Sequence, residues 1–270
     1  MNAAPGLVVT APNCAQTSGQ AFSVGGVSPD LELALELADA ADAISLPRFR
    51  TGLAVETKPD LTPVTEADRG VESELRRLLA EKRPGDAVLG EEEGVSGEGS
   101  RRWILDPIDG TRNYTRGVPI WATLVALEES GTVELGVISA PALGRRWWAE
   151  RGEGAFGDGE SLAVSAVARV DDAVLSFAYE DGVPELASRA WHVRGFGDFW
   201  AHMLVAEGAV DGAFDAVGVS EWDLAAVQVI VEEAGGRFSD FSGAARIDGR
   251  GAISSNGLLH AELLRALDTG

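Results

Sequence analysis

Hydrophobic residues recur at helical spacing in two segments of the first third of the chain. Ser28 and Pro29 are typical of the cap and first position of a helix, which we expect to end near Pro47. The apolar stripe of this helix consists of Leu33, Leu37, Ala40 and Ile44. Thr65 predicts the start of a second helix, with Asp68 three residues on. Its apolar stripe consists of Val71, Leu75 and Leu78.

Short apolar runs separated by turn residues follow. They predict strands at 87–89, 103–105, 123–127, 133–138, 145–150 and 154–156, with a hairpin turn at Ser130 and Gly131. After residue 160, predicted strands (173–177, 191–194, 212–214) alternate with predicted helices (197–207, 222–234, 258–267). The pattern indicates an antiparallel N-terminal half and an α/β C-terminal half, with a small-molecule site in the cleft between them.

A length of 270 residues fits one large domain or two closely packed subdomains. We expect a disordered tail at 1–27, an N-terminal α+β subdomain at 28–160 that carries the site, and a C-terminal α/β subdomain at 161–270 that completes it. The start of the chain is rich in Ala, Gly, Pro and Ser and does not resemble a signal peptide. The single cysteine, Cys14, allows no disulfide framework, so a cytoplasmic location is expected.

Acidic residues outnumber basic ones by 43 to 22, which gives a net charge of −21. For most of these acids, solubility is the plainest explanation. Such a surface repels nucleic acid and anionic membranes, so neither is an expected partner. It also repels a phosphate ester, unless cations reverse the sign locally.

The segment 103–111 carries the most specific chemistry. A buried strand delivers Asp106 and Asp109 at its end, Gly110 lets the backbone approach a ligand closely, and Thr111 offers a hydroxyl and an N–H group.

Two further acidic segments are expected to lie at the same site. The run 91–93 ends another strand, and Asp223 opens a helix. Mg²⁺ prefers such oxygen ligands, and two ions about 4 Å apart can hold both the attacking and the leaving oxygen of a phosphate displacement. They would also neutralise the site.

Each feature has an ordinary explanation when it is taken alone. Asp109 can mark a turn, and Thr65 with Asp68 can form a capping box. Asp223 can charge a helix start, and 91–93 can be a solvated loop. Their occurrence together and in this order is much less expected by chance.

The chain resembles the inositol-monophosphatase family. The first signature is carried by 103–114 (WILDPIDGTRNY) and the second by 221–226 (EWDLAA), and Lys58, 65–68 and 90–92 match as well. The likeness runs from about residue 30 to about residue 268. It implies a layered αβαβα sugar-phosphatase fold of the α+β or α/β class, with an antiparallel N-terminal sheet and a smaller C-terminal α/β half. It also implies a homodimer.

The resemblance also implies roles for individual residues. The metal ligands would be Glu91, Asp106, the carbonyl of Ile108, Asp109 and Asp223. Two or three Mg²⁺ ions would bind, and Mn²⁺ could substitute. Glu91 and Thr111 would position and deprotonate the attacking water, and Asp68 would orient Thr111 and help to hold a weaker third ion. The N–H groups of Gly110 and Thr111 would hold phosphate oxygens. The three histidines are not needed, and we expect them to be structural or on the surface.

A narrower likeness lies outside the metal motifs. The segments 112–124, 139–148, 197–199 and 205–211 are similar to the actinobacterial type of histidinol-phosphate phosphatase. This implies hydrolysis of L-histidinol phosphate to L-histidinol in histidine biosynthesis. Asp198 could pair with the substrate amine, and the entrance could be lined by Arg112, Asn113 and Arg116.

Two departures concern the substrate. Family members often carry a glutamate where this chain has Ala216, so either Asp215 substitutes for it or the contact is lost. The segment 178–189 is also shorter than the histidinol-phosphate type predicts. Alternatives are therefore a phosphatase for inositol 1-phosphate or another cyclitol, sugar or amino-alcohol phosphate, a 3′-phosphoadenosine phosphatase, or a non-catalytic binding protein. The intact acidic set argues against the last of these.

Overall fold

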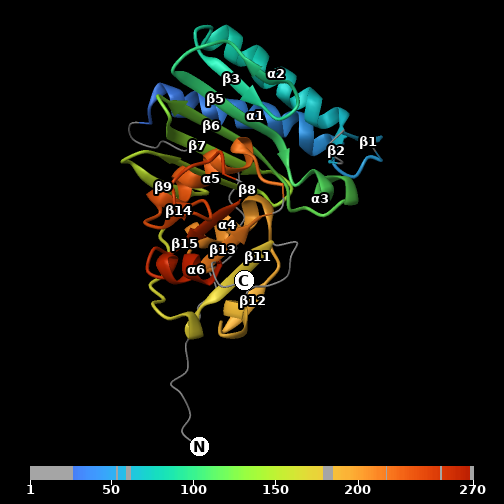
Figure 1. Cartoon of the computed structure of the whole chain (residues 1–270). Helices are drawn as coiled ribbons and strands as arrows, with labels where there is room; N and C mark the ends of the chain where they lie inside the picture. The colour runs from blue at the N-terminus through green and yellow to red at the C-terminus, as the bar shows by residue number, and fades with distance from the viewer. Residues whose placement is uncertain are drawn as a thin grey trace, which may run out of the picture.

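The computed structural model describes residues 27–52, 54–58, 62–178, 185–216, 218–249 and 251–267. The predictions about the tail before Val27, including Cys14, lie outside these residues. Two sheets and three layers of helices alternate, so the layered αβαβα fold is confirmed (Figure 1). Within the described residues, no helix combines the length and the apolar character needed to cross a membrane.

The larger sheet has eight strands. Their spatial order is β10 (Glu160–Ser161), β9 (Gly154–Gly157), β8 (Arg145–Glu150), β7 (Thr132–Ala140), β6 (Ala122–Glu129), β5 (Arg101–Asp109), β3 (Ala87–Gly90) and β4 (Gly94–Ser96). Neighbouring strands are antiparallel except β3 and β5, which are parallel. Ser130 and Gly131 both have positive φ (54° and 85°), as the tight β6–β7 hairpin requires.

The smaller sheet has five strands, and two of them were not predicted. Their order is β12 (His192–Arg194), β11 (Val174–Ala178), β13 (Gly212–Asp215), β15 (Ala252–Ser255) and β14 (Arg237–Ser239). The first three run parallel, and β13, β15 and β14 pair antiparallel. A short hairpin of β1 (Val55–Thr57) and β2 (Pro63–Thr65) stands apart.

The helices separate and cover these sheets. Helices α1 (Pro29–Arg48) and α2 (Glu66–Lys82), blue and cyan in Figure 1, cover one face of the larger sheet. Helices α4 (Asp198–Ala206) and α5 (Glu221–Glu233) lie between the two sheets, and α6 (His260–Leu267) covers the outer face of the smaller one. The short elements are α3 (Thr111–Arg116) and the 3₁₀ helices Val170–Asp172 and Glu185–Ser188.

Local chemistry explains where the first two long helices begin. Ser28 Oγ accepts the N–H of Leu31, and Pro29 occupies the first helical position. Thr65 Oγ1 accepts the N–H of Ala67 at the start of α2. Both predicted starts are confirmed.

One hydrophobic cluster joins the two halves of the chain. Leu224, Val227 and Ile230 of α5 pack in it with Leu124 of β6 and Trp147 of β8. The body of α5 is therefore buried on the larger sheet, and its first residues reach the end of β5. The site lies at this junction.

Candidate active site

A cleft of about 570 Å³ opens where β5, α3, α4 and α5 begin or end. Its lining residues are Thr62, Pro63, Glu91, Asp106, Ile108, Asp109, Gly110, Thr111, Arg112, Asn113, Ala178, Asp198, Asp215, Gly218, Ser220, Trp222 and Asp223. Of the site residues predicted from the sequence, all line this cleft except Asp68, which lies behind Thr111, and Arg116, which lies in the last turn of α3.

The end of β5 fixes two carboxylates by backbone hydrogen bonds. The N–H of Ile108 donates to Asp106 Oδ1 at 3.0 Å, and the N–H of Phe199 donates to Asp109 Oδ2 at 2.7 Å. The pairing of β5 with β6 is irregular between Asp106 and Asp109, so the strand bends at the point where it delivers them. Both side chains are almost completely buried.

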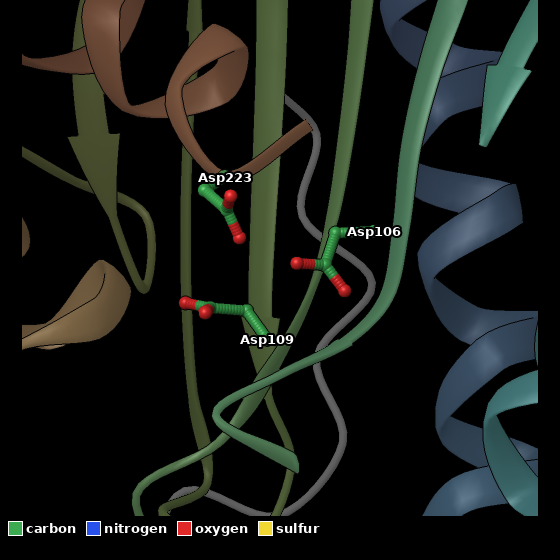
Figure 2. Close-up of side chains that lie close together, drawn as sticks. All are labelled: Asp106, Asp109 and Asp223. Atoms are coloured by element: carbon green, nitrogen blue, oxygen red, sulfur yellow. The ribbon is translucent and has the colours of Figure 1, made fainter. Parts of the chain in front are cut away.

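Asp223 completes a cluster of three carboxylates. It lies in the first turn of α5, where its Oδ2 accepts the N–H of Ser220 at 2.5 Å. Each of the three aspartates offers an oxygen within 4.8 Å of the others. Figure 2 shows Asp106, Asp109 and Asp223 turned toward one common space from β5 and α5.

The electrostatics of this cluster fit a divalent cation. Burial raises the pKa of Asp106 and of Asp109 well above the ordinary range, and the neighbouring carboxylates add to the effect. Burial likewise raises the pKa of Asp223 to about 7, against the hydrogen bond from Ser220. Three crowded anions with only oxygen donors match the chemistry that Mg²⁺ prefers, because the ion removes their repulsion.

Glu91 faces the same cleft from the end of β3 and is paired with a cation. Its Oε1 lies 2.6 Å from Lys58 Nζ, which also lies 2.8 Å from Glu92 Oε1. Burial raises the pKa of Glu91, and the Lys58 ammonium opposes this. Lys58 therefore supplies positive charge at the site, in addition to the metal ions that the sequence led us to expect.

Thr111 has two acceptors for one proton. Its Oγ1 lies 2.9 Å from the carbonyl oxygen of Ile108 and 3.3 Å from Asp68 Oδ1. Asp68 is fully buried and also accepts from the N–H and the hydroxyl of Thr65. Because the Thr111 proton is directed to these acceptors, the oxygen lone pairs remain to accept a hydrogen bond from a water molecule.

Gly110 was predicted to allow a close approach of the backbone to a ligand, and its conformation is one that favours glycine. Its φ is 78°, a conformation that residues with a Cβ rarely adopt. A Cβ at this position would also lie 3.1 Å from the Ile120 carbonyl oxygen and 3.4 Å from Asp198 Oδ2. A side chain is therefore disfavoured both by conformation and by space.

A further part of the cleft lining, which we call the acidic wall, consists of Asp198 and Asp215. Asp198 has the strained φ of 55° for a non-glycine residue, and its Oδ2 accepts from Asn113 Nδ2 at 3.3 Å. Burial raises the pKa of Asp198, while the charge of the exposed Arg112 opposes this. Asp215 is also buried there, whereas Ala216 is not a lining residue.

His202 adds a feature that the sequence did not predict. It is buried on α4, which lowers its pKa to about 4, and its Nδ1 lies 2.7 Å from Ser254 Oγ. Its Nε2 has no hydrogen-bond partner in the described structure. It lines a recess of about 30 Å³ together with Asp109, Asp198, Asp215 and Asp223. Only the fold brings this neutral imidazole to the acidic wall. His260, in contrast, contacts two serine hydroxyls and is structural.

The family model that matches this chain is that of the inositol monophosphatase family, over residues 27–269. The chain belongs to the inositol monophosphatase family. The histidinol-phosphatase of Mycobacterium tuberculosis is 52% identical over 257 residues, which is 89% of this chain and 98% of that protein. The histidinol-phosphatase of Streptomyces coelicolor is 49% identical over 261 residues, covering 88% and 97%.

Solved structures agree with this assignment. The Thermotoga maritima IMPase superposes with a TM-score of 0.82 at 32% identity, covering 90% of this chain and 98% of that one. The inositol monophosphatase family is metal-dependent, and the all-oxygen carboxylate cluster of this member fits that property. Membership supports a phosphatase function for the cleft.

Proposed function

We propose that this phosphatase hydrolyses L-histidinol phosphate to L-histidinol and phosphate, as a cytoplasmic enzyme of histidine biosynthesis. The observation that supports it best is the relationship to two histidinol-phosphatases at 49–52% identity over nearly their whole length. The acidic wall supports it as well. Asp198 and Asp215 line the cleft beside Asp109 and Asp223, where they could pair with the cationic amine of an ester bound at the metal cluster.

The ligands for Mg²⁺ in this proposal are Glu91, Asp106, the carbonyl of Ile108, Asp109 and Asp223. Two or three ions would bind, with Mn²⁺ as a substitute. When bound, they supply a Lewis acid that lowers the pKa of a water molecule and offsets the phosphate charge.

The protein groups then act on that water and on the ester. Thr111 Oγ1, with its proton directed toward Ile108 and Asp68, accepts a hydrogen bond from the water and fixes its orientation. Glu91 takes part as the base. The N–H groups of Gly110 and Thr111 hold phosphate oxygens, and Asp198 binds the amine of the leaving alcohol. Arg112 and Asn113 line the entrance, and Arg116 on the same short helix would add positive charge to it.

The remaining parts of the proposal concern organisation. The subdomains would be 28–160 and 161–270, and the working form would be a homodimer with no nucleic-acid or membrane partner. The two halves of the chain share the hydrophobic cluster around α5, so they would move as one body rather than as separate domains.

The decisive experiment is a phosphate-release screen. Substrates are L-histidinol phosphate, inositol 1-phosphate, 3′-phosphoadenosine 5′-phosphate and several sugar phosphates, each with Mg²⁺, with Mn²⁺ and with EDTA. We expect the highest kcat/KM for L-histidinol phosphate and loss of all turnover in EDTA. The Asp223→Asn variant measures the background from contaminating phosphatases. A higher kcat/KM for inositol 1-phosphate would replace the proposed substrate, and full activity in EDTA would overturn the metal-dependent mechanism.

A further inference from the structure

Helix α5 is tied to strand β5 by an ion pair outside the active-site cleft. Arg102 lies four residues before Asp106 on β5, and its Nη2 lies 2.5 Å from Glu221 Oε2 at the first position of α5. The same nitrogen lies 2.5 Å from Glu128 Oε2 on β6. One guanidinium thus connects the helix start that carries Asp223 to the two strands beside it.

Arg102 does not touch the reacting groups. It lines a separate cleft of about 530 Å³ together with Glu128, Glu221 and Arg151, and none of the carboxylates of the active site lines that cleft. We propose that Arg102 is a positioning residue, which holds the first turn of α5 against β5 and so sets the affinity of the carboxylate cluster for divalent cations.

The cluster needs such a restraint because its members come from two elements and repel one another. Asp106 and Asp109 share one strand, whereas Asp223 is brought by α5. The capping hydrogen bond from Ser220 to Asp223 is local to the helix start and does not connect it to β5. The first turn of α5 is also packed, since Leu224 is almost completely buried, but apolar contacts are non-directional and fix the position of this turn less sharply than an ion pair does.

The Arg102–Glu221 pair is a directional contact that fixes the first turn of α5 relative to β5. Charge-assisted hydrogen bonds fix geometry more sharply than apolar contacts do. The side chains are about a quarter to a third exposed, Arg102 at 25% and Glu221 at 31%. A pair of this exposure contributes little to folding, so its loss is expected to move the helix start rather than unfold the protein.

The chain offers a matched control on the same helix. Arg151 Nη2 lies 3.1 Å from Glu232 Oε2 near the other end of α5, and it lines the same cleft. Arg151→Met therefore removes an ion pair of the same kind from the same helix, but at the end of α5 that does not carry Asp223.

The test measures Mn²⁺ binding to the full chain without substrate, by electron paramagnetic resonance or calorimetry. We expect Arg102→Met and Glu221→Gln to raise the Kd for Mn²⁺ about 10-fold, the lower end of the effect of removing a group that directly orients a metal ligand. Arg151→Met should leave it unchanged. The Mg²⁺ concentration for half-maximal activity should rise in parallel, while KM for the ester at saturating Mg²⁺ changes less than about twofold.

Three further measurements keep the inference falsifiable. Arg102→Lys should recover part of the affinity, and the double variant Arg102→Met/Glu221→Gln should bind Mn²⁺ no more weakly than either single variant. Thermal melting verifies that each variant is folded. Unchanged affinity in Arg102→Met, equal losses in Arg102→Met and Arg151→Met, or additive losses in the double variant would each overturn the inference.

The inference rests on the proposed ligand set but not on the identity of the ester. If the wild-type protein fails to bind Mn²⁺, the proposed metal-dependent function falls. If the wild-type protein binds Mn²⁺ and Arg102→Met binds it equally well, only the positioning role falls.

Discussion

Helices α2 and α5 begin with the same hydrogen-bonded arrangement, but the aspartates in these two arrangements have different neighbours. In α2, the N–H of Thr65 donates to Asp68 Oδ2 at 2.9 Å, and in α5 the N–H of Ser220 donates to Asp223 Oδ2 at 2.5 Å. Both are capping boxes with aspartate at the third helical position. A capping role and an active-site role are therefore compatible, because the two oxygens of one carboxylate can serve different partners.

The second oxygen makes the difference. Asp68 faces the hydroxyl of Thr111, a neutral donor, whereas Asp223 faces Asp106 and Asp109. Burial raises the pKa of both Asp68 and Asp223, but hydrogen bonds from two threonines stabilise the charged form of Asp68. Burial raises the pKa of Asp223 to about 7, with the charges of Glu91 and Asp215 adding to the effect and hydrogen bonds from Ser220 and Asp106 opposing it. We infer that the first helix start orients a hydroxyl and that the second requires a cation.

The largest effect that separates the two helix starts is expected from Asp223→Asn. The amide oxygen can still accept the Ser220 N–H, so the cap persists while a ligand charge is lost. We expect kcat/KM at saturating Mg²⁺ to fall at least about 10³-fold, roughly 4 kcal/mol of transition-state stabilisation. The melting temperature without metal should not fall, because a repelling buried charge has been removed. Near wild-type turnover would remove Asp223 from the metal site, and Asp109→Asn is the parallel test for β5.

The second prediction concerns pH and follows from the raised pKa values. Because Asp106, Asp109 and Asp223 have a higher pKa folded than unfolded, the folded protein binds more protons above about pH 4. The stability of the metal-free protein therefore falls as pH rises toward and through about 7. Mg²⁺ binds the deprotonated form and restores stability, by about 3 kcal/mol at 100 times its Kd.

The measurement is thermal melting with saturating Mg²⁺ and with EDTA from pH 5 to pH 8. The difference in melting temperature should widen with pH and reach several degrees at pH 8. A difference that is constant across this range would mean that the cluster does not exchange protons for metal. In Asp223→Asn, the widening should be reduced.

The sequence predicted the elements with strong periodicity and missed those without it. Helix α2 has a clear apolar stripe, and the β6–β7 hairpin has a clear turn signal. Strand β15 is only Ala252–Ser255, with two serines, and α3 is a single six-residue helix between glycines. Such short segments gain their structure from neighbouring elements rather than from their own pattern.

From local sequence alone, the part of the site that could be predicted is the part whose residues lie close together in the chain. Asp106, Asp109 and Thr111 lie within six positions, so one strand end places them together. The pairing of Lys58 with Glu91 and the unpartnered Nε2 of His202 depend on how distant segments pack, and local spacing contains no signal for them. Arg116 was expected at the entrance, but it lies in the last turn of α3 and is not a lining residue of the cleft.

The third prediction addresses the helix start of α2. In Asp68→Asn, the amide oxygen would keep the acceptor position toward Thr65, which places the NH₂ group toward Thr111. A donor then replaces an acceptor, and the Thr111 hydroxyl loses its fixed direction. We expect kcat to fall about 10- to 100-fold with KM and Mn²⁺ affinity little changed. Thr111→Ser, which keeps the hydroxyl, is the matched control. A loss of Mn²⁺ affinity as large as in Asp223→Asn would make Asp68 a metal ligand and erase the contrast between the two helices.

The smallest expected effect extends the comparison to α4, which begins at Asp198 without a side-chain cap. This carboxylate is not used for capping, and it accepts from Asn113 through Oδ2, which leaves Oδ1 to recognise the substrate. Asp198→Asn is preferable to alanine, since asparagine tolerates the φ of 55°. We expect KM for L-histidinol phosphate to rise about 10-fold, the effect of one lost charged hydrogen bond, with KM for inositol 1-phosphate nearly unchanged. Equal increases in KM for both esters would show that Asp198 does not bind the amine. It would instead support the cleft as a whole, through Asn113 and the start of α4.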